Sequence, residues 1–124
     1  MDYNILFNNM KEALEYFKIS KDDFYIKVNY HPDSLERFTC NNNIYYHVGK
    51  GRKLSSGYPI ANQMWYNQNR LVDKICKNLS IAVFEIYYDN KVIYIGNYIF
   101  DKYEKKIANN GFTYFEFKLL KIKY

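Results

Sequence analysis

Three consecutive segments with β-strand character occupy the last third of this 124-residue chain, and they constrain its fold more than any other feature. Residues 81–88 are nearly all apolar, which predicts a strand in the middle of a sheet. The Asp-Asn pair at 89–90 supplies a tight turn, and residues 91–100 return as the hairpin partner. A second turn at 109–111 leads into a last strand at 112–122. These strands predict a largely antiparallel sheet.

The last of these strands has the pattern of a sheet with one buried face. Phe115, Phe117 and Leu119 alternate with Glu116 and Lys118. Because successive side chains of a strand point to opposite faces, we expect the apolar set in the core and the charged set in water.

The remaining elements complete a single α+β domain. Apolar residues at helical spacing predict a helix at 4–18 and a second helix, with one basic face, at 60–77. Short strands are expected at 24–28 and 44–48. The order α-β-β-α-β-β-β over residues 1–124 predicts a mostly antiparallel twisted sheet, or a partly closed β-barrel, flanked by two helices.

The charge and aromatic content of the chain favour a polyanionic partner. The formal net charge is +5, and aromatic residues make up 20% of the chain, including 15 tyrosines. Cations attract phosphates, and planar rings stack on bases. A codon bias toward Asn, Lys, Ile and Tyr explains the tyrosine excess equally well, so tyrosine content alone assigns no function.

Sequence motifs for catalysis or metal binding are absent. Cys40 and Cys76 have no CxxC partner, and His31 and His47 lack a metal-ligand spacing. No Ser-His-Asp arrangement or phosphate-loop motif occurs, so we expect no catalytic centre, no metal and no cofactor. The chain starts without an apolar signal segment, and no run approaches the roughly 20 apolar residues of a membrane span. We therefore expect a cytoplasmic protein with free thiols and no membrane contact.

Basic residues cluster in the glycine-containing loop after the strand at 44–48 and on the helix at 60–77. The candidate phosphate contacts are Lys50, Arg52, Lys53, Arg70 and Lys74. Aromatic residues are interleaved with these cations in the sequence, as in proteins that hold an extruded base. A solvated lysine face with Trp65 in the core accounts for the same pattern, so charge alone leaves both interpretations open.

From residue 44 onward, the order of short motifs resembles the SRA-like (SAD/YDG-related) domains at the front of modification-dependent restriction endonucleases. Those domains have a strand ending in a glycine loop, an Asp-Gln dipeptide, a Gly-Asn pair and three strands of characteristic sequence. The corresponding segments here are 47–51, 62–63, 68–71, 82–85, 94–96 and 117–119. Four positions depart from the family pattern, namely His47 for Tyr, Lys50 for an acidic residue, Asn62 for Asp and Gln68 for Gly.

The resemblance implies a PUA-like barrel that flips a base out of DNA and into a pocket. The residues that it assigns to this pocket are Tyr45, Tyr46, His47, Asn62, Gln63, Trp65 and Asn69. Tyr45, Tyr46 or His47 would stack on the base, and the amides at 62 and 63 would bind its edge. Asn69 would either contact the base or brace the loop. Gly49 and Gly51 would let the loop backbone approach closely.

The expected partner is therefore DNA with a modified base. The chain would act as a non-catalytic module in a restriction or related system, alone or at the N-terminus of a longer protein with a nuclease or AAA+ partner domain. A protein-interaction module, such as a viral or phage inhibitor that meets an acidic partner, is the second hypothesis. An enzyme that acts on nucleotides is the third.

Overall fold

The computed structural model describes residues 5–20 and 22–123. In chain order its elements are β1 (Leu6–Phe7), α1 (Met10–Tyr16), β2 (Tyr25–Asn29), β3 (Arg37–Thr39), β4 (Ile44–Val48), the 3-10 helix η1 (Trp65–Gln68), α2 (Asn69–Lys77), β5 (Ile81–Ile86), β6 (Val92–Ile107) and β7 (Thr113–Lys121). Among these described residues, no helix has the length and apolar character needed to cross a membrane.

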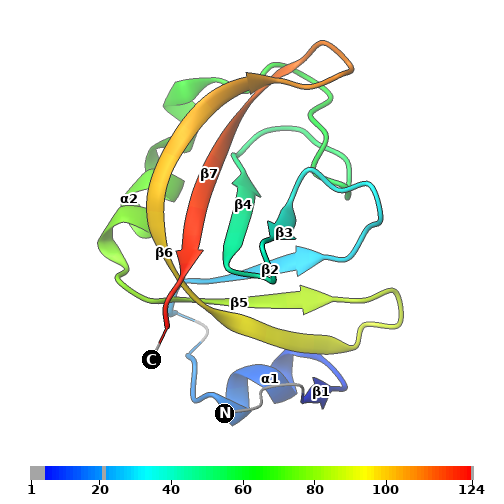
Figure 1. Ribbon diagram of the computed structural model, residues 1–124, viewed down its shortest axis with the longest axis vertical. Helices are drawn as coiled ribbons and strands as arrows, with labels where there is room; N and C mark the ends of the chain where they lie inside the picture. Colours follow the sequence, from blue (N-terminus) through cyan, green and yellow to red (C-terminus); the bar gives the residue numbers. More distant parts are fainter. Residues whose placement is uncertain (1–4, 21, 124) are drawn as a thin grey trace.

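The strands form one strongly curled sheet in the order β2-β5-β6-β7-β4-β3, with β1 added beside β6. Strands β2 and β5 run parallel, and the other pairs of named strands are antiparallel. Strand β6 arcs from the bottom of the molecule to its top, so the sheet wraps into a half-barrel (Figure 1). The half-barrel stays open between its two edge strands, β2 and β3. The predicted α+β class, with a partly closed barrel and two helices, is confirmed.

The curl depends on the length of β6 and on two interruptions in its pairing. The register with β5 shifts between Val83 and Phe84, and the register with β7 shifts between Phe100 and Lys102. Such irregularities bend a strand and increase its twist. The sequence predicted that this strand ends at residue 100, because the residues that follow are mostly polar. They remain in the sheet because β7 pairs with them while their side chains are largely exposed.

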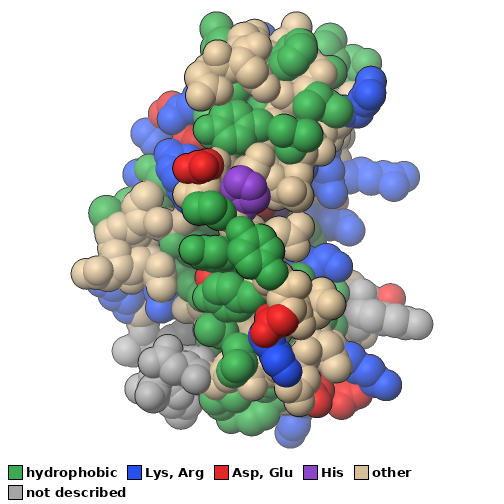
Figure 2. All heavy atoms as spheres, turned by 90° about the vertical axis from the view of Figure 1, so that its right-hand side faces the viewer, with side chains coloured by type: hydrophobic (Ala, Val, Ile, Leu, Met, Phe, Trp, Pro, Cys, Tyr) green, Lys and Arg blue, Asp and Glu red, His purple; other side chains and the backbone are tan. Residues whose placement is uncertain are grey.

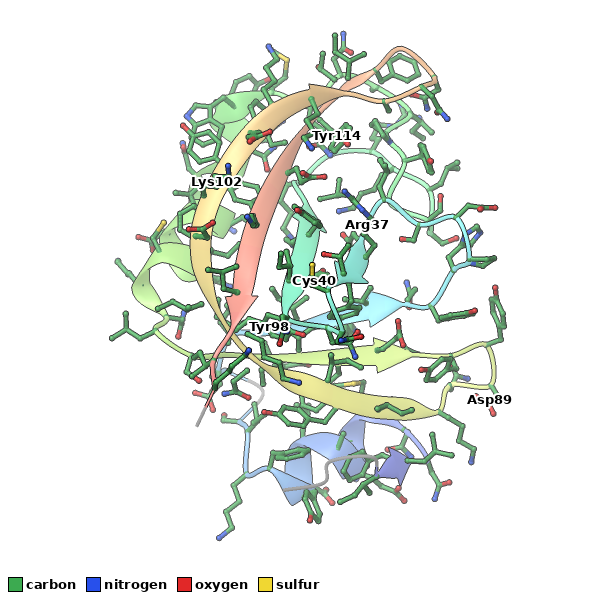
Figure 3. The ribbon with its side chains drawn as sticks, viewed as in Figure 1. Arg37, Cys40, Asp89, Tyr98, Lys102 and Tyr114 are labelled. Carbon is green, nitrogen blue, oxygen red and sulfur yellow. The ribbon has the colours of Figure 1, made fainter. Side chains whose placement is uncertain are left out.

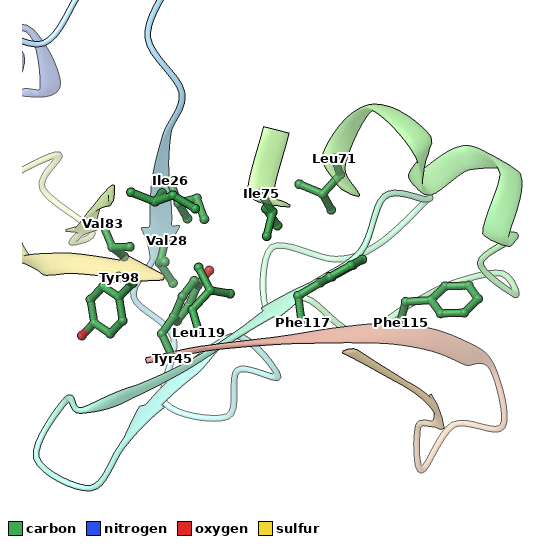
Figure 4. Close-up of a cluster of buried hydrophobic side chains, with 11 residues drawn as sticks. Ile26, Val28, Tyr45, Leu71, Ile75, Val83, Tyr98, Phe115, Phe117 and Leu119 are labelled. Atoms are coloured by element: carbon green, nitrogen blue, oxygen red, sulfur yellow. The ribbon is translucent and has the colours of Figure 1, made fainter. Parts of the chain in front are cut away.

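The main core lies between the inner face of the sheet and α2. Leu71 and Ile75 of α2 belong to the same buried cluster as Tyr45, Phe117 and Leu119 (Figure 4). These helix residues carry the apolar stripe that predicted an amphipathic helix in this part of the chain.

A second, smaller core lies under α1, on the opposite face of β5 and β6. It contains Phe7 and Ala13 together with Phe84 and Val92. Val83 and Phe84 are neighbours in β5 but belong to different cores, because side chains alternate across a strand. Strand β5 is therefore buried on both faces, which explains its nearly continuous apolar sequence.

The first helix is shorter than its periodicity predicted. The side-chain oxygen of Asn9 accepts a hydrogen bond from Glu12 N at 2.9 Å, so the helix begins at Met10. Lys18 has a φ of 56°, in the left-handed region that ends helices. The preceding strand β1 pairs with β6 instead of joining the helix. The predicted start at residue 4 lies outside the described residues.

Helical structure in the second predicted helix begins with η1 at Trp65 and continues with α2 at Asn69, rather than at residue 60. Gln63 N donates to Thr113 O, and Thr113 N donates to Asn62 Oδ1, both at 2.9 Å. These bonds hold residues 62–63 beside β7, and the backbone of Met64 is extended, with φ −104° and ψ 139°, so helical structure starts only after it. Strand β3, which the sequence did not predict, has 3 residues and pairs with β4. A segment this short carries no readable period.

Glu116 departs from the pattern expected for β7. It is only 4% exposed. Its carboxylate lies 2.8 Å from Lys106 Nζ and 3.2 Å from a guanidinium nitrogen of Arg37, which is on β3 (Figure 3). The expectation that Glu116 faces water was wrong, because cations from two other strands cover its charge.

Candidate nucleic-acid interface

Two buried glutamines hold the loop that follows β4. Gln63 Nε2 donates to Gly49 O at 2.9 Å, and Gln63 Oε1 accepts from Phe115 N at 2.9 Å. Gln68 Oε1 accepts from Lys50 N at 2.7 Å, and Gln68 Nε2 donates to Lys50 O at 2.8 Å. Buried amides with satisfied hydrogen bonds rigidify the backbone that they contact. The path of this loop is therefore fixed relative to β7 and η1.

Gly49 lies between these two amides, and its position leaves no room for a side chain. A Cβ at this position would stand 2.6 Å from Gln68 Oε1 and 2.9 Å from Gln63 Oε1. Those separations are shorter than any normal contact, so a larger residue would displace both glutamines. The close approach expected at Gly49 is therefore one between its backbone and the side-chain amides of Gln63 and Gln68.

A cavity of about 760 Å³ opens where the loop meets α2, and we call it the α2 cavity. Its lining residues are Phe24, Lys50, Gly51, Tyr66, Asn67, Asn69, Arg70, Leu71 and Lys74. Lys50, Arg70 and Lys74 make it positively charged, and none of its lining residues is acidic. The glycine loop and the start of the second helix therefore converge on one cavity.

Further along the same loop, Lys53 approaches Glu36, the residue before β3, and we call the group around this carboxylate the Glu36 cluster (Glu36, Tyr45, His47 and Lys53). The Glu36 carboxylate lies 3.4 Å from Tyr45 Oη, 3.7 Å from His47 Nδ1 and 3.5 Å from Lys53 Nζ. Tyr45 Oη and His47 Nδ1 share a hydrogen bond of 2.8 Å. Lys53 Nζ also donates to two backbone carbonyls at the end of β4. This cluster joins β3, β4 and the loop.

Burial sets the protonation of two members of this cluster. Desolvation lowers the pKa of His47 to about 4; the nearby Glu36 opposes this shift, whereas Lys53 and Lys50 add to it. Burial, reinforced by Glu36, raises the pKa of Tyr45 well above its ordinary value. Both side chains are therefore uncharged at neutral pH.

A second cavity, of about 500 Å³, occupies the opening between β2 and β3, and we call it the seam cavity. Its lining residues are Asn29, Tyr30, His31, Pro32, Ser34, Glu36, Arg37, Phe38, Asn42, Glu85, Tyr87, Ile93 and Ile95. Aromatic and aliphatic side chains share this lining with polar and charged groups, so a ligand in the cavity would meet both ring faces and hydrogen-bonding groups. Figure 2 shows the side of the molecule where the loops beside this cavity lie, with hydrophobic side chains gathered along it.

Known structures share this architecture. No family model matches the chain, and no curated protein matches it in sequence. The SRA domain of SUVH5 in complex with fully methylated CG DNA superposes with a TM-score of 0.67 at 16% identity, covering 100% of this chain and 90% of that one. The same domain bound to fully hydroxymethylated CG DNA gives 0.63 at 20% identity, covering 95% of this chain and 87% of that one. The fold is that of the SRA domain.

A restriction enzyme shares the SRA fold. The modification-dependent restriction endonuclease TagI matches with a TM-score of 0.66 at 12% identity. The match covers 99% of this chain but only 50% of TagI.

Within this SRA fold, two residues predicted for the base pocket have structural roles. Tyr45 is 0% exposed, and the ring of Phe38 stacks on it with centroids 4.9 Å apart. Gln63 is 4% exposed, and both ends of its amide bind the backbone. Tyr45 therefore offers no free ring face to a base, and Gln63 offers no free edge. This corrects the stacking role expected of Tyr45 and the edge contact expected of Gln63.

Other predicted pocket residues lie apart from one another. The Arg37 guanidinium lies 4.3 Å from the ring centroid of Tyr46, which points to the face of β4 opposite His47. Trp65 stacks on Tyr103 with centroids 4.7 Å apart. Asn69 lines the α2 cavity, whereas the Asn62 side chain binds the backbone of β7.

The predicted phosphate contacts divide between two places. Lys50, Arg70 and Lys74 line the α2 cavity, whereas Lys53 turns toward Glu36. Arg52, on the loop between Lys50 and Lys53, is exposed.

Sequence reasoning missed the two residues that organise this region. Gln68 appeared only as a departure from the family pattern, although it is 0% exposed and holds Lys50 through two hydrogen bonds. Glu36 precedes a strand too short to be recognised, so nothing in the sequence placed it beside His47. Both roles depend on contacts between distant segments.

Proposed function

We propose that this chain is a DNA-reading module that holds an extruded, modified base in the seam cavity. The observation that carries the proposal is the rigid cationic loop with Lys50 on the α2 cavity and Lys53 beside Glu36. The loop thus links the positively charged α2 cavity to the mostly buried carboxylate of Glu36, which can accept hydrogen bonds. The SRA fold supports the proposal, because the SUVH5 structures that match it contain methylated or hydroxymethylated DNA.

The phosphate backbone is proposed to cross the loop and the start of α2. Lys50, Arg70 and Lys74 supply charge from the α2 cavity, and Arg52 supplies it from the exposed loop. Such contacts fix the position of the duplex but carry no sequence information. Because Gln63 and Gln68 hold the loop, little order has to be gained on binding.

The base is proposed to enter the seam cavity beside Glu36. A carboxylate accepts hydrogen bonds and therefore suits the exocyclic amine of a cytosine-type base. Its contacts at 3.4, 3.5 and 3.7 Å are long, which leaves capacity for a shorter bond to a ligand. The neutral His47 adds no charge that would repel the amine. Extrusion of the base costs a few kcal/mol, which stacking and edge contacts offset.

We further propose that catalysis, where it accompanies reading, belongs to a nuclease or AAA+ partner domain rather than to this chain. TagI, a modification-dependent restriction endonuclease, supports this division, since the match leaves half of that protein for other tasks. Cys40 and Cys76 are free and exposed, which suits the cytoplasm proposed for this chain.

A binding panel tests this function. Plain, methylated, hydroxymethylated and glucosylated duplexes of one sequence are titrated with the chain at several salt concentrations. We expect a preference for at least one modified duplex and a steep loss of affinity with salt. Glu36→Gln should reduce the preference by roughly tenfold while plain-duplex binding persists. Glu104→Gln, on the exposed stretch of β6, is the matched control and should behave like the unmodified chain.

Two results would contradict the proposal. Equal affinity for all duplexes would remove the base-reading function and leave a general DNA-binding surface. Stoichiometric binding to an acidic protein that DNA does not compete away would favour the interaction module instead.

A further inference from the structure

Three tyrosines at the rim of the seam cavity form a cluster that the proposed base pocket does not require. Tyr30 follows β2, whereas Tyr87 and Tyr88 follow β5. The ring centroid of Tyr30 lies 5.3 Å from that of Tyr87 and 5.8 Å from that of Tyr88. Tyr30 is 41% exposed and Tyr88 is 76% exposed. We call this group the tyrosine platform (Tyr30, Tyr87 and Tyr88).

Hydrogen bonds hold the platform in place. Tyr30 N donates to Ile86 O at 2.7 Å, which joins the two segments that carry the rings. Asn90 N donates to Tyr87 O at 2.9 Å and closes the β5–β6 turn, with Asp89 at its tip (Figure 3). Tyr87 Oη donates to Glu85 at 2.7 Å. A platform ordered in advance loses little entropy on binding.

A hollow of about 210 Å³ lies against the platform. Its lining residues are Asn29, Tyr30, His31, Ser55, Ile86, Tyr87, Tyr88 and Asn90. Four of them, Asn29, Tyr30, His31 and Tyr87, also line the seam cavity, so the two spaces adjoin. Ser55 lies in the same connection between β4 and η1 as Lys50 and Lys53 of the cationic loop. The hollow thus adjoins the space proposed for the extruded base.

The chemistry of the lining favours a flat, neutral ligand with hydrogen-bonding edges. None of the lining residues is Lys, Arg, Asp or Glu, so a phosphate would find no ammonium or guanidinium group and an ammonium ligand no carboxylate. Amides and a hydroxyl can pair with the edge of a base, and tyrosine rings can stack on its face. Burial, together with the bond to Glu85, raises the pKa of Tyr87 to about 12, so its hydroxyl stays protonated at neutral pH.

We infer that the tyrosine platform stacks a second, unpaired nucleobase beside the extruded one. This inference rests on the proposed DNA-reading function and extends it from one base to a locally opened strand. The chain then holds the DNA at three linked places, which are the phosphates at the cationic loop, the extruded base in the seam cavity and the neighbouring base on the platform.

The test compares a modified duplex with the same duplex carrying a short flap of unpaired thymidines next to the modified base. Stacking of one base on an aromatic side chain is expected to tighten binding of the flap substrate by about tenfold. Tyr88→Ala should abolish this gain, whereas Tyr88→Phe should keep it, because the ring rather than the hydroxyl makes the contact. A 2-aminopurine in the flap reports stacking directly: the unmodified chain and Tyr88→Phe should quench its fluorescence, and Tyr88→Ala should not.

Tyr16→Ala is the matched control, because Tyr16 is 58% exposed on α1, under the opposite face of the sheet. Circular dichroism checks that each variant is folded. If no duplex binds, the proposed function itself is wrong. If the duplex binds but the flap adds nothing, or if Tyr88→Ala keeps the gain, only the platform inference is overturned. Choline binding that Tyr88→Ala removes, with no response to the flap, would also overturn the inference, since it would identify a cation site.

Discussion

The side chain of Gln68 closes two hydrogen bonds on the backbone of Lys50, one to its N–H at 2.7 Å and one to its carbonyl at 2.8 Å. Gln68 is in η1 and Lys50 is in the cationic loop after β4, so the amide of Gln68 joins η1 to this loop. The position of the loop therefore depends on a side chain that is itself fully buried.

Gln68→Ala should lower the free energy of unfolding by about 3 kcal/mol, because it leaves a backbone N–H and a carbonyl without their partner. Urea denaturation measures this loss. Asn67→Ala, which removes an exposed amide from the neighbouring position of η1, should stay within about 0.5 kcal/mol of the unmodified chain. Equal stability of the two variants would show that the loop does not depend on Gln68.

His47 should make the stability of the fold pH-dependent below neutrality. Its pKa falls from 6.5 to about 4 on folding, so the unfolded chain binds more protons between these values. Stability is therefore lost as the pH falls through this window, by roughly 3 kcal/mol between pH 7 and pH 4. Urea denaturation at pH 7 and pH 4.5 should show a smaller difference for His47→Gln than for the unmodified chain.

His31→Gln is the control for this experiment, since His31 lies in the loop between β2 and β3 and is not part of the Glu36 cluster. It should keep the pH difference of the unmodified chain. If His47→Gln keeps the full difference as well, the buried histidine is not its source.

Glu116→Gln should weaken the contact that joins β3, β6 and β7. The loss is expected to be about 1–2 kcal/mol, below the value for a fully buried ion pair, because Arg37 is 41% and Lys106 is 37% exposed and water screens both. Thermal denaturation measures the change. Glu104→Gln removes an exposed carboxylate next to the same lysine and should cost less than 0.5 kcal/mol. Equal effects would mean that burial adds nothing to the Glu116 contact.

The cations of the α2 cavity should act on DNA affinity through charge alone. Lys50→Ala and Lys74→Ala are each expected to weaken binding to all duplexes alike and to reduce the slope of log affinity against log salt by about one. Fluorescence anisotropy over a salt series measures this slope. Lys11→Ala, on α1, should leave it unchanged. A changed preference between modified and plain duplexes in the lysine variants would place these residues at the base instead.

Local sequence determined those elements whose signal lies within one segment. The apolar run of β5, the 44–48 strand and the hairpin turn at 89–90 were all predicted, because periodicity and turn residues act over a few neighbours. The order of motifs from residue 44 onward also predicted the fold, which the SRA structures confirm.

Only the tertiary structure decided which side chains are free to meet a ligand. Tyr45 and Gln63 looked available in the sequence, but one is covered by core rings and the other is bonded at both ends to the backbone. Glu116 looked like a solvated acid, and Glu36 carried no signal of a role, until the fold brought cations against both and a histidine against Glu36. Burial and pairing depend on groups far apart in the chain, so a local pattern carries no record of them.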